Sequence, residues 1–267
     1  MLKLRLRKSV KVISIDPGWR ETSKRNAVVV ATPSGRIDYV ASGLSDEGLK
    51  SLVKERAEPR SFILLDVPVE RCDISGHWRP VEKALQHYLS LYPISMAGKR
   101  GPELKRSLLE ALPSTLRSGV SVQEIYPHAV YKFLWAAKQK GKLESVTQGI
   151  WERILDESFR REYPPRYKGQ FTRDQRLCGL RRLYDFLTGL GLDFTERLAC
   201  PGDELSGRVM DRLSDEYDAC LGAVAGLYYS NGNPYARVVG EREQGDILLL
   251  ADVWLAGELR KRGMNVV

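Results

Sequence analysis

Residues 11–18 read KVISIDPG, and this stretch decides how the rest of the sequence is interpreted. Its residues alternate as in a strand with two different faces, and the Pro-Gly pair then ends the strand in a turn. The last residue of this strand is a carboxylate, Asp16. Residues 62–65, FILL, form a continuous apolar run, as a strand buried on both faces requires, and Asp66-Val67-Pro68 follows them. Two predicted strands therefore end alike, each on an aspartate.

Strand and helix patterns continue outward from these two segments. Further strands are predicted at residues 26–32, 36–42 and 120–126, with a last possible strand at 247–250. Helical spacing is present at 46–56, 78–88, 103–112 and 211–229. This order predicts an α/β fold with a sheet of mixed strand direction. We expect a single domain over residues 1–267, with a helical, basic insertion at 138–205.

Composition and charge narrow the class of protein. The 267 residues are 43% hydrophobic and 28% charged, which excludes a disordered or fibrous chain. The longest apolar run, residues 219–229, is shorter than the roughly 20 residues of a membrane span, so we expect a cytoplasmic protein without a membrane partner. The four cysteines are far apart in the sequence, which favours reduced thiols. A net charge of +8 favours a polyanionic partner, although a basic surface without a specific partner fits it equally well.

Four aspartates are the candidate chemical groups. Helical spacing puts Asp215 and Asp218 on one face, about 5 to 6 Å apart at Cβ. Asp16 and Asp66 fall at the carboxyl ends of strands, where open α/β sheets bind ligands. Carboxylates brought this close raise one another's pKa unless a cation neutralises them, and hard oxygen ligands favour Mg²⁺ or Mn²⁺. The alternative is structural: Ser214 would cap the helix, and acids in the first turn would favour its dipole.

The motifs resemble those of a known superfamily. Ile15-Asp16-Pro17-Gly18 followed by Arg20, and Asp215-Glu216-Tyr217-Asp218-Ala219 opening a helix of small residues, resemble the first and last motifs of RuvC-type Holliday-junction resolvases, in the RNase H-like superfamily. In overall layout the chain resembles more closely the predicted RNase H-fold nucleases of domain-of-unknown-function family four-two-nine. The pattern of that family recurs in Asp66-Val67-Pro68, Arg71-Cys72-Asp73 and Glu124-Ile125-Tyr126-Pro127.

This resemblance implies an RNase H-like mixed five-stranded sheet flanked by helices. It also implies metal ligands in Asp16 from the first strand, Asp66 from the fourth, and Asp215 or Asp218 from the last helix, with Glu124 as a further ligand or a neighbouring group. Two features differ from the resolvases: those proteins carry Glu where this chain has Asp66, and they have no counterpart of the 138–205 block. The resemblance therefore does not extend to junction specificity.

The basic block contains the candidate nucleic-acid contacts. Between Trp151 and Phe186 lie nine Lys or Arg residues, six acids and seven aromatic residues. Such interleaving can hold a single strand by backbone charge and base stacking, whereas the alternative is a helical subdomain with an aromatic core and solvated arginines. Together with the motif arginine, the expected contacts are Arg20, Arg160, Arg161, Arg166, Lys168 and Arg173.

These observations predict a nuclease that depends on Mg²⁺ or Mn²⁺ and hydrolyses the phosphodiester bonds of DNA or RNA by a two-metal mechanism, with ions about 3.5 to 4 Å apart. A catalytically idle nucleic-acid-binding protein on the same fold is the first alternative. The second is an ATP-using phosphotransferase of the actin and hexokinase type, because Asp16-Pro17-Gly18 followed by Thr22-Ser23 resembles a phosphate loop. That fold needs a duplicated domain and a second Gly-rich hairpin, and the sequence contains neither.

Overall fold

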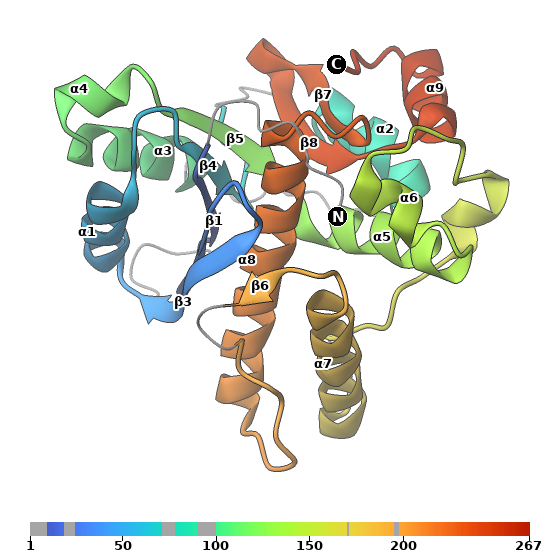
Figure 1. Ribbon diagram of the computed structural model, residues 1–267, viewed down its shortest axis with the longest axis horizontal. Coiled ribbons are helices and arrows are strands. Elements are labelled where there is room, and N and C mark those ends of the chain that lie inside the picture. Colours follow the sequence, from blue (N-terminus) through green and yellow to red (C-terminus); the bar gives the residue numbers. More distant parts are fainter. Residues whose placement is uncertain (1–9, 19–24, 71–77, 90–99, 170, 195–197) are drawn as a thin grey trace.

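The computed structural model describes residues 10–18, 25–70, 78–89, 100–169, 171–194 and 198–267, and Figure 1 shows a central sheet with helices on both sides. The strands are β1 (Val12–Asp16), β2 (Asn26–Ala31), β3 (Arg36–Leu44), β4 (Phe62–Leu65), β5 (Ser121–Ile125), β6 (Asp193–Phe194), β7 (Ala236–Glu241) and β8 (Gly245–Leu250). The α-helices are α1 (Asp46–Arg56), α2 (Pro80–Leu89), α3 (Arg100–Ala111), α4 (Ser114–Arg117), α5 (Pro127–Gln139), α6 (Leu143–Gln148), α7 (Arg173–Thr188), α8 (Gly207–Ser230) and α9 (Val253–Lys261). Two 3-10 helices, η2 (Glu157–Arg161) and η3 (Arg242–Gln244), complete the described elements.

The described strands form one mixed sheet in the order β6-β3-β2-β1-β4-β5-β8-β7. β2 is antiparallel to both β1 and β3, whereas β1, β4, β5 and β8 are parallel neighbours and β7 pairs antiparallel with β8. The expected count of five strands was too low. The five are contiguous, from β3 to β5, but β8 and β7 extend one edge and the two-residue β6 extends the other. The hairpin edge strand β7 was missed because its residues are only partly buried and alternate weakly.

Each face of the sheet builds its own hydrophobic core. Along β1, Ile13 and Ile15 pack in a core with α1 and α3, while Val12 faces the larger core formed with α2, α5, α7 and α8. This is the period-two alternation of a strand covered on both sides. The mixed α/β fold and the helices on both faces of the sheet are therefore as expected.

Helix α8 crosses the sheet on the side of the larger core and uses small residues to come close. A Cβ at Gly222 would lie 2.2 Å from the Ser14 hydroxyl, and a Cβ at Gly226 would lie 2.7 Å from a Val12 methyl. The helix begins at Gly207, where the Ser206 side chain accepts a hydrogen bond from the backbone, so Ser214 is not its cap. Two full turns therefore precede the aspartates, and dipole stabilisation does not account for them. Nor is α8 the last helix, because α9 follows it.

The block at 138–205 packs as part of the larger core. Phe159, Tyr167 and Phe186 are buried in that core, whereas Trp151 and Tyr163 are exposed. The block is not purely helical, since β6 adds two residues to the edge of the sheet beside β3. Most of its aromatic side chains therefore serve packing, in agreement with the structural alternative, and the division of the chain into a domain with an insertion stays a prediction.

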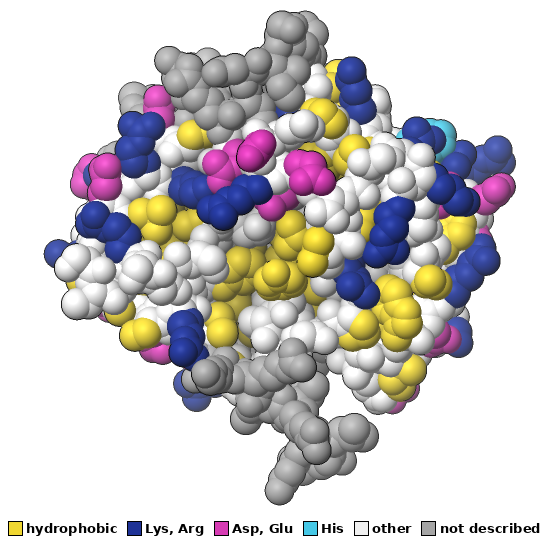
Figure 2. Space-filling view, turned by 90° about the horizontal axis from the view of Figure 1, so that it is seen from above, with side chains coloured by type: hydrophobic (Ala, Val, Ile, Leu, Met, Phe, Trp, Pro, Cys, Tyr) yellow, Lys and Arg dark blue, Asp and Glu magenta, His cyan; other side chains and the backbone are white. Residues whose placement is uncertain are grey.

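The described residues can be compared with the predictions on membrane spans, thiols and surface charge. In the described part of the chain, no helix combines the length and the apolar character that crossing a membrane requires. Cys178, Cys200 and Cys220 are free thiols. Figure 2 shows Lys and Arg side chains scattered over the face seen from above, with Asp and Glu among them. On that face the excess positive charge is not gathered into one patch.

We expect Gly226→Ala to lower the free energy of unfolding by about 1 to 3 kcal/mol, because the added methyl group would overpack α8 against β1 and β4. The matched control is Gly257→Ala in α9, where no heavy atom lies within 4 Å of the added carbon. That change should raise stability by up to about 1 kcal/mol through helix propensity alone. Urea unfolding measures both, and equal effects would contradict the close packing of α8.

Candidate metal centre

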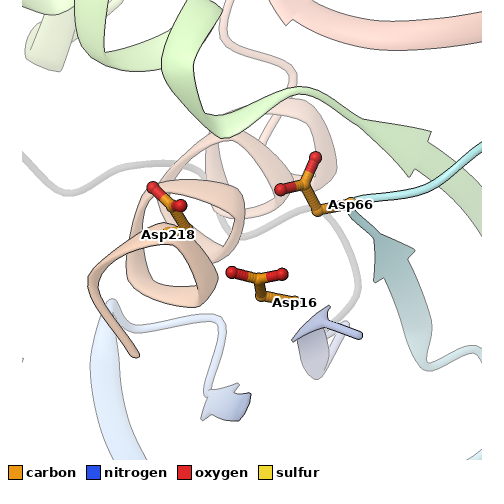
Figure 3. Close-up of side chains that lie close together, drawn as sticks. All are labelled: Asp16, Asp66 and Asp218. Carbon is orange, nitrogen blue, oxygen red and sulfur yellow. The ribbon is translucent and has the colours of Figure 1, made fainter. Parts of the chain in front are cut away.

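Three of the four predicted aspartates converge. Asp16 is the last residue of β1, Asp66 directly follows the parallel neighbour β4, and Asp218 lies in the fourth turn of α8. One carboxylate oxygen from each lies within 4.8 Å of the others, and Figure 3 shows the three side chains near one another, with Asp218 on α8 and Asp16 and Asp66 at strand ends. Because parallel strands end at the same edge of a sheet, β1 and β4 bring the first two acids together. We call Asp16, Asp66 and Asp218 the acidic triad.

The fourth aspartate, Asp215, joins this group through a lysine. Lys168 Nζ lies 3.1 Å from Asp16 Oδ2 and 3.1 Å from Asp215 Oδ1, and it also forms an ion pair with Asp218. Arg25 adds a longer ion pair, with its guanidinium 3.8 Å from Asp215 Oδ2. Lys168 was expected to contact nucleic acid, but in this structure its ammonium group bridges three acids of the site.

Lys168 is held in place by the segment that carries it, residues 164–169, which we call the strap. The neighbouring Tyr167 is buried, and its hydroxyl donates a hydrogen bond to the Asp218 carboxylate. Gly179 of α7 packs directly against the strap, because a Cβ at this position would lie 1.9 Å from the carbonyl oxygen of Arg166. The strap is therefore packed between α7 and the acids.

The first two residues of α3 contact the segments that follow Asp16 and Asp66. Arg100 donates from Nε to the Gly18 carbonyl at 3.1 Å, and its guanidinium pairs with Asp46. Gly101 lies against the other loop, where a Cβ would come within 1.7 Å of the Pro68 carbonyl oxygen. Helix α3 thus fixes the turn after Asp16 and the segment after Asp66 at once.

Glu124 does not belong to the acidic triad. It is buried in β5, where both of its carboxylate oxygens accept hydrogen bonds from Arg79. Arg79 also pairs with Glu82, and all three side chains are almost fully enclosed. Burial raises the pKa of Glu124, and the Arg79 guanidinium opposes that rise. The role of Glu124 here is that of a buried ion-pair partner beside the site.

Loss of hydration dominates the electrostatics of the acids. Burial raises the pKa of Asp16 to about 7, because the lost hydration outweighs the attraction of Lys168. Burial also raises the pKa of Asp66 well above its usual range, and the charges of Asp16 and Asp218 add to the rise. Burial alone would lower the pKa of Lys168, but the acids around it raise that pKa well above its usual range. Without a further cation, Asp16 and Asp66 therefore hold a proton more tightly than carboxyl groups in water do.

A cavity of about 430 Å³ opens beside this cluster. It is lined by Asp16, Asp215 and Lys168, and by Pro17 and Gly18. Asp211, Arg25 and Arg176 also line it, and these three were not singled out from the sequence. Their only sequence signal was the charge pattern, which is common on solvated helices.

The basic residues that were expected to contact nucleic acid lie in different environments. Arg160 stacks on the Tyr88 ring with its guanidinium carbon 5.1 Å from the centroid, and Arg173 donates to the Leu205 carbonyl at 3.2 Å. These two arginines already have partners within the protein. Arg161 is exposed, with no packing role evident among the described residues.

Two further arginines, Arg166 and Arg20, were expected to contact nucleic acid. Arg166, in the strap, is exposed and lies 5.7 Å from the exposed Tyr163 ring and 5.6 Å from the Phe171 ring. Arg20 lies outside the described residues, as do Arg71-Cys72-Asp73. Among the described residues that were expected to contact nucleic acid, Arg166 lies in the strap close to the acids and also has a solvent-exposed side chain.

We expect stability in EDTA to fall between about pH 4 and pH 7. Asp16 has a folded pKa of about 7, above its ordinary value of 3.8, so the folded state binds the proton more tightly. Its contribution is full below pH 4 and is lost as the pH rises through 7, amounting to up to about 4 kcal/mol. Urea unfolding at pH 5 and pH 8 should therefore show a smaller pH difference for Asp16→Asn than for wild type.

The matched control for this pH dependence is Asp156→Asn. Hydrogen bonds from Lys140 and Ser158 lower the pKa of Asp156 to about 2, so its contribution is fully present above pH 4 and does not change between pH 5 and pH 8. The control should shift stability equally at the two pH values. An unchanged pH difference in Asp16→Asn would show that Asp16 is not a desolvated carboxyl.

Comparison with known proteins does not assign this site to a family. No known protein family, no curated protein and no solved structure matches the chain. The resemblance to RNase H-like nucleases therefore depends on short motifs and on the placement of the acids they contain. The function has to be argued from the geometry of the acidic triad and its surroundings.

Proposed function

We propose that this protein is a divalent-metal-dependent nuclease that hydrolyses phosphodiester bonds of nucleic acid on an RNase H-like fold. The observation that carries the proposal is the convergence of Asp16, Asp66 and Asp218 from two adjacent parallel strands and α8, with their oxygens within 4.8 Å. The resemblance implies acids from the first strand, the fourth strand and the last helix. The triad acids come from the ends of β1 and β4 and from α8, which α9 follows.

The residues of the triad fit Mg²⁺ or Mn²⁺. All three donors in this group are carboxylate oxygens, which these hard cations prefer. Among the described residues, no side chain donates a hydrogen bond to the Asp66 carboxylate, although burial raises its pKa. Such a carboxylate has oxygens free for a cation. A bound ion would supply Lewis-acid polarisation of the phosphate and activation of water.

The chain's own residues orient this chemistry. Arg100 and Gly101 fix the loops that follow Asp16 and Asp66, so the two carboxylates keep their separation when charge is added. Tyr167 holds Asp218 by a hydrogen bond. The adjoining cavity, at about 430 Å³, offers space for a nucleotide unit beside the triad. The net charge of +8 supports a polyanionic substrate.

One observation favours a second candidate, a nucleic-acid-binding protein with an idle site. The ammonium group of Lys168 already contacts Asp16, Asp215 and Asp218, and thus supplies part of the positive charge that a metal would supply. If Lys168 satisfies the cluster completely, no ion binds. The two candidates differ in cleavage and in metal binding. The phosphotransferase alternative has less support, because the described strands form one sheet and not two.

We expect cleavage of at least one of single-stranded, double-stranded or branched DNA or RNA in Mg²⁺ or Mn²⁺. Asp66→Asn should lower the rate by about 100-fold or more while substrate binding survives, because it removes a ligand of the ion. The control is Asp185→Asn, an exposed acid of α7, which should leave the rate unchanged. Absence of any cleavage above the Asp66→Asn background across the panel would favour the idle binding protein.

Nucleic-acid binding should weaken with salt, and Arg166 should contribute to that dependence. In the Asp66→Asn background with EDTA, Arg166→Ala should reduce the slope of log K against log salt by about 0.7 for one lost phosphate contact on a single strand. The control is Arg106→Ala, an exposed arginine of α3 on the opposite face of the sheet. Fluorescence anisotropy at several salt concentrations measures both slopes. Equal slopes would show that Arg166 in the strap does not contact the nucleic acid.

A further inference from the structure

We propose that Lys168 is a built-in second cation of this site, so that each chain binds one divalent ion and not two. The inference rests on the proposed function, and it specifies how that function is carried out. It arises from the overlap of two sets of contacts. The triad consists of Asp16, Asp66 and Asp218, whereas Lys168 contacts Asp16, Asp215 and Asp218.

The two sets define two neighbouring cation positions. Asp16 and Asp218 belong to both positions, Asp66 belongs only to the triad, and Asp215 belongs only to the lysine position. Two acids that bridge a pair of cation positions are the arrangement expected of a two-metal centre. Here one of the two positions already holds the Lys168 ammonium group. The triad position would take the divalent ion.

The placement of Lys168 follows from the packing of its backbone. The contact between Gly179 and the Arg166 carbonyl leaves no room for a side chain at 179, so the strap lies directly against α7. Tyr167 is 4% exposed and its ring centroid lies 6.0 Å from that of Tyr131. The residue before Lys168 is therefore anchored in the core. The packing of the strap thus places the backbone of Lys168 beside the acids.

Charge explains why the lysine position would exclude a second ion. Four carboxylates carry four negative charges when ionised, and Lys168 with one divalent ion supplies three positive charges. A second divalent ion would bring the sum above neutrality and would lie against the ammonium group, since both need Asp16 and Asp218. Arg25, 3.8 Å from Asp215, adds further repulsion on that side. The ammonium group would then stabilise charge on the substrate phosphate from the second position.

The test is the number of Mn²⁺ ions bound per full-length chain, measured by isothermal titration calorimetry and confirmed by electron paramagnetic resonance. Wild type should bind one ion. Lys168→Met keeps most of the volume but removes the charge, and it should bind two. Lys168→Arg keeps the charge and should bind one. The matched control is Lys140→Met, which removes a lysine paired with Asp156 and Glu162 away from the site and should bind one.

A second pair of variants keeps the test decisive if Lys168→Met does not fold, which circular dichroism would reveal. Asp215→Asn should leave the count at one with little change in affinity, because Asp215 holds the lysine and not the ion. Asp66→Asn should abolish binding. Two ions in wild type, falling to one in Asp215→Asn, would overturn the inference but leave the nuclease proposal standing. A folded Lys168→Met that binds one ion would also overturn it. No ion in wild type would overturn the proposed metal function itself.

Discussion

The burial of several carboxylates at one edge of a sheet is the constraint on which this structure depends. Asp16, Asp215 and Asp218 are each less than one tenth exposed, and like charges so close together are stable only when a cation or bound protons neutralise them. Among the described residues, the Lys168 ammonium group contacts all three of these acids, and Arg25 lies 3.8 Å from Asp215. The raised pKa of Asp16, about 7, shows that this lysine alone does not compensate for the lost hydration. The remaining deficit of positive charge is what a divalent ion would supply.

The rest of the fold brings these acids together. Small residues on α8 let the helix lie directly on β1 and β4, and this close approach places Asp218 beside the strand ends. On the other side of the sheet, the start of α3 fixes the loops after both strands through Arg100 and Gly101. At the glycines of α8 and α3, this close approach leaves no room for a larger side chain, and each glycine loses conformational freedom on folding. The close packing of α8 and α3 therefore sets the positions of the three carboxylates.

The sequence predicted the parts of the site that depend on local pattern. A strand that ends on an aspartate is visible in residues 11–18, and the i, i+3 spacing of Asp215 and Asp218 indicates one helix face. The spacing did not predict that Asp218 alone would join the triad, because rotation of α8 about its axis is set by packing against β1. Lys168 lies 152 positions after Asp16, and its contact with the acids depends on the path of the strap over α7. Strand β6 was missed for a similar reason, because it pairs with β3, which is distant in the sequence, whereas β7 was missed because its own pattern of burial is weak.

The central claim is that the acidic triad is a divalent-cation site. Crystals soaked in Mn²⁺ and measured by anomalous diffraction test it most directly, because the anomalous signal locates the ion without reference to activity. The account predicts one peak at coordination distance from Asp16, Asp66 and Asp218, with Lys168 still paired with Asp215. The absence of a peak between these three carboxylates at saturating Mn²⁺ would contradict it.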